Sequence, residues 1–449
     1  MKKSYWNIIL PAFFILAVGF VVIRFKDKQK AEHNEAYAFL PRIDNNNKVE
    51  WEAAKKNADK LIAKIKTDPY DTRSTLALAN AYIMEARISG NTAYYDRAAM
   101  KTVDKLLEKE PGNYEALMLR SLVQLSQHHF AETLATAQLA ESIDANSAFV
   151  YGLLIDANVE MGNYEAAVAA AEKMVSIRPD LRSYSRIAYL REIHGDYPGA
   201  AVAMKLAVEA GVTAEESTEW CRVQLGKLYE HMGDVAKASF QYKLSLAARP
   251  GYAYALAGLG RIAVYEKKYD SAVHYYEQAA ALINDLGIKE ELVKAYMYAG
   301  QVERSASLNK ELINEMNKAA KLLVNDPGAG HYSDKEMAYA YIQNKDYDKS
   351  LEYAMAEYKR RPKNIEVNET MAWVHYKRNE IDKALTYLDA ALITKSMNPV
   401  LLCTTGLIYK KAGNTEKAKK MLELGLKHNP VMPEEIKNES KEALKELMD

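Results

Sequence analysis

Residues 225–250 read LGKLYEHMGDVAKASFQYKLSLAARP, and this stretch decides the fold. Small and apolar residues recur every three or four positions as far as Tyr229, which is the spacing of one helix face. Gly233 then supplies the left-handed backbone that commonly ends a helix. The same spacing resumes through Tyr242 and stops at Pro250, because proline cannot continue a helix. The stretch therefore predicts two amphipathic helices joined by a tight turn.

The same unit recurs along the chain with a period of 34 residues. From about residue 50 onward the sequence is helical in character, with no alternating run typical of a strand. Three series of helix-ending residues are spaced by one period: Pro111, Ala145 and Pro179; Pro250 and Asn284; Pro362, Ser396 and Pro430. A fixed period of this length is typical of repeat proteins that grow by stacking, so the usual estimate of domain number from length does not apply.

The repeat resembles the tetratricopeptide repeat, whose signature is W-x2-L-G-x2-Y, then A-x3-F, then P. Four copies carry the resemblance: Leu225-Gly226-x2-Tyr229 with Ala238-x3-Tyr242 and Pro250; Gly406-x2-Tyr409 with Ala418-x3-Leu422 and Pro430; Leu259-Gly260 with Ala272-x3-Tyr276; and Tyr151-x2-Leu154 with Ala167-x3-Ala171 and Pro179. The resemblance covers about residues 70–432. It implies an all-α solenoid, a superhelix of helix-turn-helix repeats whose concave groove receives a peptide or a partner's helix.

About ten repeats are expected over residues 71–432, preceded by a leading helix at 49–70 and followed by a capping helix at 433–449. Their expected starts are residues 72, 114, 148, 182, 219, 253, 287, 331, 365 and 399. The first repeat carries an insertion of about eight residues around Ile88 to Tyr95, which we expect to lengthen the loop between its helices. The seventh repeat runs from about 287 to 330, and its apolar spacing predicts an extended second helix.

The N-terminal region predicts a membrane anchor over residues 1–30, followed by a polar tether at 31–48. The uncharged stretch at residues 5–23 would span about 28 Å as a helix, close to the thickness of a bilayer core. A cleaved signal peptide is the alternative, since Ala17-Val18-Gly19 is a passable cleavage site. The basic residues after the stretch favour a cytoplasmic body, whereas the Met-Lys-Lys start favours export. We expect a single-pass protein whose body is extracytoplasmic (periplasmic).

The sequence offers no sign of catalysis, a cofactor or a metal site. Residues 258–263 (GLGRIA) match a dinucleotide fingerprint as text, but they lie inside an expected helix rather than after a strand. The histidines lack metal-ligand spacing, and no phosphate-binding loop is found. The 60 basic and 60 acidic residues cancel, so no overall field draws nucleic acid. We therefore expect a protein that is not an enzyme and binds protein rather than nucleic acid.

The leading hypothesis is a membrane-tethered scaffold that binds a peptide or partner protein in its groove. The alternative is an accessory or regulatory subunit of a membrane enzyme or of a secretion or assembly machine, with the chemistry on the partner. Aromatic residues and long cations at expected groove positions are the residue types that binding hot spots favour. These candidates are Phe149, Trp220, Lys227, Tyr254, Arg261, Tyr332, Tyr339 and Trp373. Trp220 and Trp373 are expected to be the least involved in core packing.

Overall fold

The computed structural model describes residues 37–43, 48–325, 330–427 and 432–448. These residues form 22 α-helices and no strand, which confirms the predicted all-α solenoid. The helices are α2 (Lys48–Thr67), α3 (Thr72–Ser89), α4 (Thr92–Lys109), α5 (Tyr114–Ser126), α6 (Phe130–Ile143), α7 (Ala148–Met161), α8 (Tyr164–Ile177), α9 (Leu181–Ile193), α10 (Tyr197–Glu209), α11 (Glu216–His231), α12 (Val235–Ala248), α13 (Ala253–Tyr265), α14 (Tyr269–Ala280), α15 (Leu286–Tyr298), α16 (Val302–Asn325), α17 (Asp334–Gln343), α18 (Tyr347–Arg360), α19 (Ile365–Lys377), α20 (Ile381–Ala391), α21 (Pro399–Lys411), α22 (Thr415–Lys427) and α23 (Glu434–Glu446).

None of these helices combines the length and the apolar character that a membrane span requires. The expected anchor at residues 5–23 lies outside the described residues.

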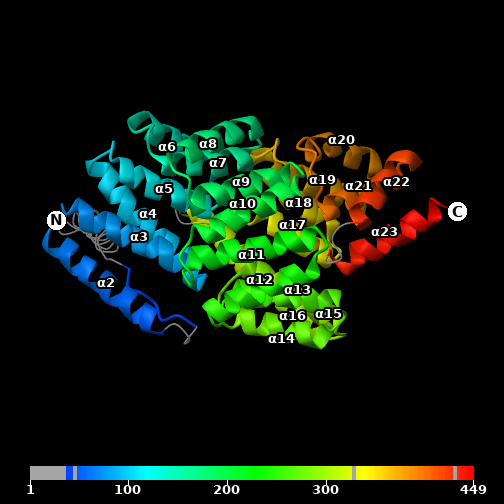
Figure 1. Ribbon diagram of the computed structural model, residues 1–449, viewed down its shortest axis with the longest axis horizontal. Coiled ribbons are helices and arrows are strands. Elements are labelled where there is room, and N and C mark those ends of the chain that lie inside the picture. Colours follow the sequence, from blue (N-terminus) through cyan, green and yellow to red (C-terminus); the bar gives the residue numbers. More distant parts are fainter. Residues whose placement is uncertain (1–36, 44–47, 326–329, 428–431, 449) are drawn as a thin grey trace, which may run out of the picture.

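The helices pair into successive antiparallel hairpins, from α3–α4 to α21–α22, with α2 before them and α23 after them (Figure 1). We number these ten hairpins as repeats 1 to 10. First helices of neighbouring repeats contact one another, whereas second helices pack mainly against first helices. The array therefore curves with its first helices on the inside and its second helices on the outside.

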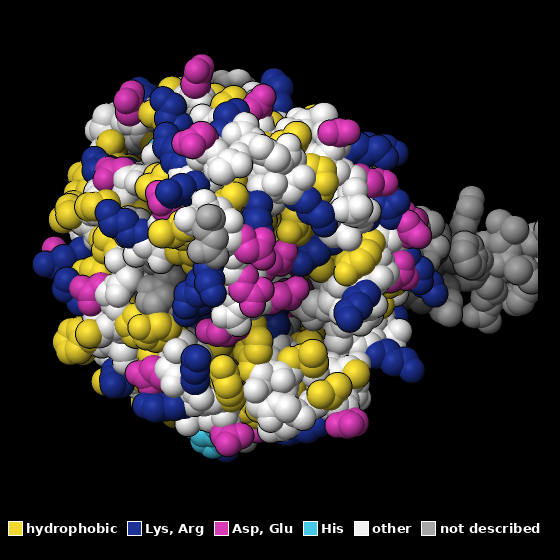
Figure 2. Space-filling view, turned by 90° about the vertical axis from the view of Figure 1, so that its right-hand side faces the viewer, with side chains coloured by type: hydrophobic (Ala, Val, Ile, Leu, Met, Phe, Trp, Pro, Cys, Tyr) yellow, Lys and Arg dark blue, Asp and Glu magenta, His cyan; other side chains and the backbone are white. Residues whose placement is uncertain are grey.

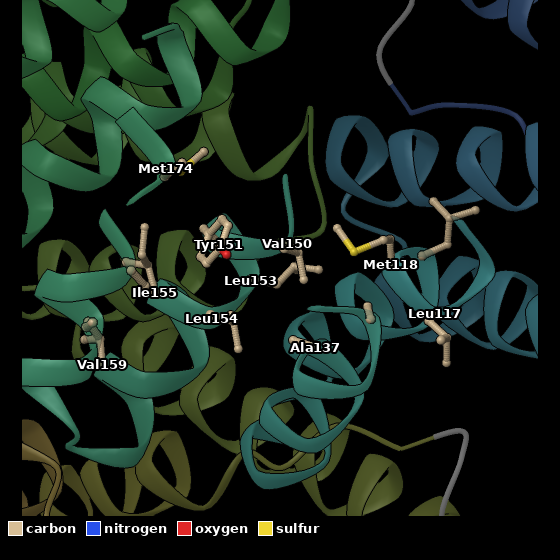
Figure 3. Packing of buried hydrophobic residues seen from close by; sticks show 14 of the residues in the cluster. Leu117, Met118, Ala137, Val150, Tyr151, Leu153, Leu154, Ile155, Val159 and Met174 are labelled. Carbon is tan, nitrogen blue, oxygen red and sulfur yellow. The ribbon is translucent and has the colours of Figure 1, made fainter. Parts of the chain in front are cut away.

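Each hairpin buries its apolar face against the next hairpin, as Figure 3 shows for α5 to α8. The Tyr242 ring is fully buried between two repeats, where it lies under Gly226 of its own repeat and Gly258 of the next. A Cβ atom at Gly226 would lie 2.4 Å from this ring, and one at Gly258 would lie 2.7 Å from it. Glycine at these positions thus makes room for the tyrosine that joins the repeats.

The first repeat corrects one expectation. Its insertion does not lengthen the loop, because α3 and α4 each extend to 18 residues and only two residues separate them. The added turns carry Tyr82 and Tyr95, whose buried rings pack together with Phe39 from the preceding segment. The extended second helix expected in the seventh repeat is present as α16, with 24 residues.

Residues 37–43 pack against the first repeat, so the prediction of a polar tether is wrong for these residues. The Phe39 side chain is 4% exposed, with its ring centroid 5.7 Å from that of Tyr82. The Tyr82 hydroxyl donates a hydrogen bond of 2.5 Å to the carbonyl of Tyr37. Arg42 donates two hydrogen bonds of 2.7 and 2.8 Å to the buried Glu85 carboxylate. The segment serves as a cap on the first hairpin.

A second set of contacts joins residues about 200 positions apart, which is close to six 34-residue repeats. The turn between the helices of repeats 1 to 4 meets the linker that precedes repeats 7 to 10, and we call this line of contact the seam. The amide of Tyr332, which precedes repeat 8, donates a hydrogen bond of 3.2 Å to the carbonyl of Gln127 in repeat 2. The Asn364 side chain donates to the carbonyls of Val159 and Glu160, over 3.3 and 3.1 Å. The superhelix therefore closes on itself after six repeats (Figure 1).

Arg361 is the most connected side chain of the seam. It is 4% exposed and pairs with Glu357 of its own repeat and Glu160 of repeat 3. Its guanidinium carbon also lies 4.6 Å from the centre of the Phe130 ring, at the start of α6. One cation thus ties together three segments that are distant in sequence.

Candidate functional site

The inner face of the superhelix is lined with charges that pair between first helices of neighbouring repeats. Arg186 on α9 binds Asp156 on α7 over 2.6 Å. Lys335 on α17 donates a hydrogen bond of 2.6 Å to Glu366 on α19. Partners in these pairs are 30 or 31 residues apart, which places each on the equivalent face of adjacent first helices. Most cations of the inner face are therefore already engaged within the chain.

Arg261, expected to be a cation available to a partner, illustrates this pairing. It contacts Glu230 over 3.0 Å and Glu291 over 3.4 Å, and it donates to the Tyr242 hydroxyl over 3.2 Å. Burial lowers the pKa of the neighbouring Lys227, and the positive charge of Arg261 lowers it further. The two expected cations of the groove thus lie close together, and Arg261 is committed to structural ion pairs.

Carboxylates predominate where the inner face of repeat 4 meets the inner faces of repeats 8 to 10. A cavity of about 180 Å³ opens there between α9, α17, α19 and the start of α21. Glu192, Glu366 and Glu369 line it, together with Lys335 and a group of aromatic side chains. Three tyrosines belong to that group: Tyr189, Tyr197 and Tyr339. The volume suits one or two side chains of a partner rather than a whole helix.

The Glu369 carboxylate is the least compensated charge of this cavity. Within the described part of the chain, it takes part in no hydrogen bond or ion pair. Burial and then the nearby negative charge of Glu366 raise the pKa of Glu369 to about 8, against the lowering effect of the Lys335 charge. The ammonium of Lys335 has the opposite effect on Glu366, whose pKa it lowers. A cation entering the cavity would meet one carboxylate that has no other partner.

A second carboxylate close by, Glu160, also has its pKa raised to about 7, chiefly by burial and then by the charge of Glu366. Figure 2 views the molecule from the side of the C-terminal repeats and shows acidic side chains gathered centrally with basic ones around them. Glu160 and Glu369, whose pKa values are raised, are thus both influenced by the charge of Glu366.

The eight expected groove residues do not form one continuous surface. Tyr339 lines the acidic cavity, whereas Tyr254 lies on α13 and donates a hydrogen bond of 3.1 Å to Asp285. The Phe149 ring lies 5.1 Å from the guanidinium carbon of Arg182. The half-buried Trp220 packs on the core of α9 to α11. These positions are all on first helices, but they are distributed over several repeats.

Two more of the eight residues, Trp373 and Tyr332, make packing contacts within the array. The Trp373 side chain is 5% exposed and packs with Leu407 and Leu422 beneath the capping helix α23. This burial corrects the expectation that the Trp373 ring contributes little to the core. Tyr332 belongs to the seam, where its ring lies 4.1 Å from the guanidinium carbon of Arg360. It precedes α17 and is not on a first helix.

Glu192, Glu366 and Glu369 were not among the residues predicted from the sequence, because aromatic residues and long cations are the residue types that binding hot spots favour. A signal was available in the spacing of opposite charges. Arg261 has a glutamate 31 residues before it and another 30 residues after it, whereas Glu369 has no basic residue at either distance. This spacing singles out Glu369 but not Glu366, which has Lys335 at 31 residues before it, nor Glu192, which has Arg222 at 30 residues after it.

Comparisons with known proteins agree with the repeat assignment. The tetratricopeptide-repeat family model matches residues 253–285 and 401–431. No curated protein matches the chain in sequence. Among solved structures, the Cut9–Hcn1 hetero-tetramer of the APC/C is 16% identical, with a TM-score of 0.45, covering 96% of this chain and 82% of that chain. A tetratricopeptide-repeat protein from Parabacteroides merdae is 16% identical, with a TM-score of 0.42, covering 57% of this chain and 100% of that chain.

The two matched segments coincide with repeat 6 and repeat 10, which begin with α13 and α21. These two segments therefore match the tetratricopeptide repeat in sequence, and the predicted signature residues and the succession of helical hairpins resemble that family over the rest of the array.

Proposed function

We propose that the protein is a membrane-tethered scaffold that binds an extended, basic segment of a partner protein in its acidic inner cavity. Tetratricopeptide repeats suggest protein–protein interaction in general. The observation that carries the more specific proposal is the Glu369 carboxylate, which is half-buried beside Glu366 and, within the described residues, forms no ion pair although the charge of Lys335 acts on it. A lysine or arginine of a partner would supply the missing charge, and its approach would lower the pKa of Glu369.

The size of the cavity supports an extended segment rather than a helix. An α-helix with its side chains is about 10–12 Å across, which is much more than a cavity of about 180 Å³ admits. The tyrosines of the cavity offer flat faces for the aliphatic stem of a long cation and for the cation itself. Recognition would then depend on one or two inserted side chains and on charge.

The proposal is tested by a photoreactive amino acid placed at Tyr339 in the full chain in cells. We expect it to crosslink a partner through a lysine-rich or arginine-rich segment, with a yield that falls as ionic strength rises. The double variant Glu366→Gln and Glu369→Gln should reduce the yield about tenfold or more, because the charge complementarity is lost.

The matched control is the double variant Glu416→Gln and Glu423→Gln, which removes two exposed carboxylates of α22 and should leave the yield unchanged. Equal crosslinking by both double variants, or crosslinked segments without basic residues, would contradict the acidic cavity as the binding site.

Tethering is a separate part of the proposal and rests on the uncharged stretch at residues 5–23. A cysteine at Asn46 of the full chain can be labelled in intact cells with a reagent that does not cross membranes. Labelling in intact cells is expected if the body is extracytoplasmic. Labelling only after lysis places the body in the cytoplasm, and loss of the first residues from the mature protein indicates a cleaved signal.

A further inference from the structure

The acidic cavity is assembled from two turns of the superhelix. Repeats 1 to 6 make up the first turn, and repeats 7 to 10 belong to the second. Tyr189 and Glu192 of α9 line the cavity from the first turn. Lys335, Glu366 and Glu369 line it from α17 and α19 of the second turn. The two sets meet because the second turn is stacked on the first (Figure 1). The cavity therefore keeps its shape only while the seam between the two turns is closed.

The seam passes directly beside the cavity at the linker that precedes repeat 10. Ser396 and Asn398 of this linker line the cavity, and Met397 between them packs on the core of α9 to α11. A Cβ atom at Gly195, in the hairpin turn of repeat 4, would lie 2.9 Å from the Met397 side chain and 2.9 Å from the Lys395 carbonyl oxygen. One wall of the cavity is thus held in place by contacts across the seam.

An electrostatic link joins the cavity to the seam between repeats 3 and 9. Glu160 binds Arg361 across the seam, and Lys335 binds Glu366 at the cavity. The pKa of Glu160 is raised to about 7, first by burial and then by the charge of Glu366. The pKa of Glu366 is lowered by the charge of Lys335 and, less strongly, by that of Arg361. Charge in the cavity therefore acts on the ion pair of the seam.

A cation bound beside Glu366 would strengthen the seam through this link. The cation would offset the negative charge of Glu366, and the pKa of Glu160 would fall because that charge helps to raise it. Glu160 would then be ionised in a larger fraction of molecules. An ionised carboxylate binds the Arg361 guanidinium more strongly than a protonated one does. Binding in the cavity and closure of the seam thus favour each other.

We propose that closure of the seam and binding of a basic partner segment in the acidic cavity are coupled, so that each stabilises the other. This inference rests on the proposed function of the cavity. Because linked binding equilibria are reciprocal, the factor by which a closed seam tightens binding is also the factor by which binding favours the closed seam. A solenoid without a seam has no such coupling, since its distant repeats do not contact one another.

The test uses the full chain in detergent, with acetylated pentalysine amide as the basic probe. The amide of Tyr332 reports on the seam, because it donates to the Gln127 carbonyl across the seam and lies outside the lining of the cavity. Saturation with pentalysine should slow hydrogen exchange at this amide about fivefold or more, and exchange in α22 should not change. In the double variant Glu366→Gln and Glu369→Gln, the probe should bind about tenfold more weakly and should not protect Tyr332 at the same concentration.

The reciprocal test weakens the seam and measures binding of the same probe. A Cβ atom at Gly162 would lie 2.5 Å from the Lys363 backbone across the seam, so Gly162→Ala should weaken pentalysine binding about fivefold or more. Neither residue lines the cavity. The matched control is Gly413→Ala, because a Cβ atom there meets nothing within 4 Å and the affinity should not change.

A milder pair of variants keeps the test valid if Gly162→Ala does not fold. Tyr164→Phe removes the hydroxyl that accepts a hydrogen bond of 2.8 Å from the Ile365 amide across the seam, and it should weaken binding by a smaller factor. Tyr94→Phe removes a hydroxyl that bonds within the N-terminal part of the array, over 2.8 Å, and should leave the affinity unchanged.

The possible failures of the two proposals are distinguishable. Unchanged exchange at Tyr332 in the saturated protein, or seam variants that bind pentalysine as tightly as their controls, would overturn the coupling and leave the cavity as the binding site. Equal binding with and without the two glutamine substitutions would overturn the proposed function together with this inference.

Discussion

The turns within the hairpins are of two kinds, and the difference shows what holds this solenoid together. Gly162 and Gly413 both end a first helix in the left-handed conformation, each with a φ of 77°. A Cβ atom at Gly162 would lie 2.5 Å from the backbone of Lys363, across the seam, whereas a Cβ atom at Gly413 would meet nothing within 4 Å. The same local structure is thus a buried joint in repeat 3 and an open turn in repeat 10.

Solenoids are usually stabilised by nearest-neighbour interfaces alone, so distant repeats do not influence one another. Here, the seam adds contacts between repeats six positions apart. Repeats 3 and 9 should therefore open together, whereas the C-terminal repeat can open without them.

Arg361→Ala should reduce the free energy of unfolding by about 3–5 kcal/mol, because it leaves the Glu160 carboxylate without its cation and leaves Glu357 paired with Arg360 alone. Hydrogen exchange should rise in repeat 3 as well as in repeat 8, whose last helix Arg361 follows. The control is Arg378→Ala, whose partner Asp348 is 89% exposed and which should cost no more than about 1 kcal/mol. Exchange that rises in repeat 8 alone would show that the seam does not couple these two repeats.

Trp373→Ala should cost a similar amount, about 3–5 kcal/mol, through loss of a large buried side chain. Its contacts are with α21, α22 and α23, so increased hydrogen exchange should be confined to the C-terminal repeats. The half-buried Trp220 offers the comparison, and its replacement by alanine should cost less. If Trp373→Ala leaves the melting temperature unchanged, the ring does not have the packing role described here.

Gly162→Ala should cost about 2–3 kcal/mol and Gly413→Ala about 1 kcal/mol, as measured by denaturant unfolding. Both substitutions incur the strain of a positive φ, which is about 1–2 kcal/mol per residue. Only Gly162→Ala also places a Cβ atom against the Lys363 backbone and so forces the seam apart. Equal costs for the two variants would mean that the seam yields without loss of stability at this point.

The smallest expected effect concerns pH. The imidazoles of His128 and His331 lie 4.1 Å apart at the seam, and each Nδ1 lies 3.0 Å from a carbonyl across it. Burial lowers the pKa of both histidines. The unfolded chain therefore binds protons more readily, so this contribution to stability is fully present above about pH 6.5 and is lost progressively as the pH falls from there through the lowered pKa values of the folded state.

Charged groups around the pair modify this trend, among them Lys335, Arg361, Glu336 and Glu357. They are retained in His128→Asn, and asparagine tolerates the positive φ of residue 128. The variant should lose less stability between pH 7.5 and 5.5 than the unchanged protein does. Identical pH profiles in urea unfolding would exclude the histidine pair as a pH-dependent element.

The sequence predicted the local units well because each repeat carries its own information. Helix periodicity, the turn glycines and the helix-ending prolines lie within a few residues of the structure they specify. The ten first helices begin within three residues of the expected positions. The seam was not predictable in this way, because Gly162 and Lys363 share no pattern that a local period reveals. The same applies to Phe39, a single apolar residue in a polar stretch whose burial depends on Tyr82 and Tyr95.

The candidate site was predicted less well, since the sequence alone does not show which charges are already paired. Arg261 resembled an available cation, yet two glutamates and a tyrosine hydroxyl surround it. Trp373 resembled a surface aromatic, because the capping helix that covers it lies more than sixty residues later in the chain. Both errors come from partners contributed by other repeats.

The six-repeat spacing of the seam also bears on how this protein can evolve. Ordinary solenoids gain and lose repeats by duplication or deletion, because any repeat can stack on any other. In this chain, an extra repeat inserted between repeat 4 and repeat 7 would move the hairpin turns of repeats 1 to 4 away from the linkers that they contact across the seam. We expect natural relatives to vary in length at the ends of the array and to keep constant the number of repeats between the two sides of the seam.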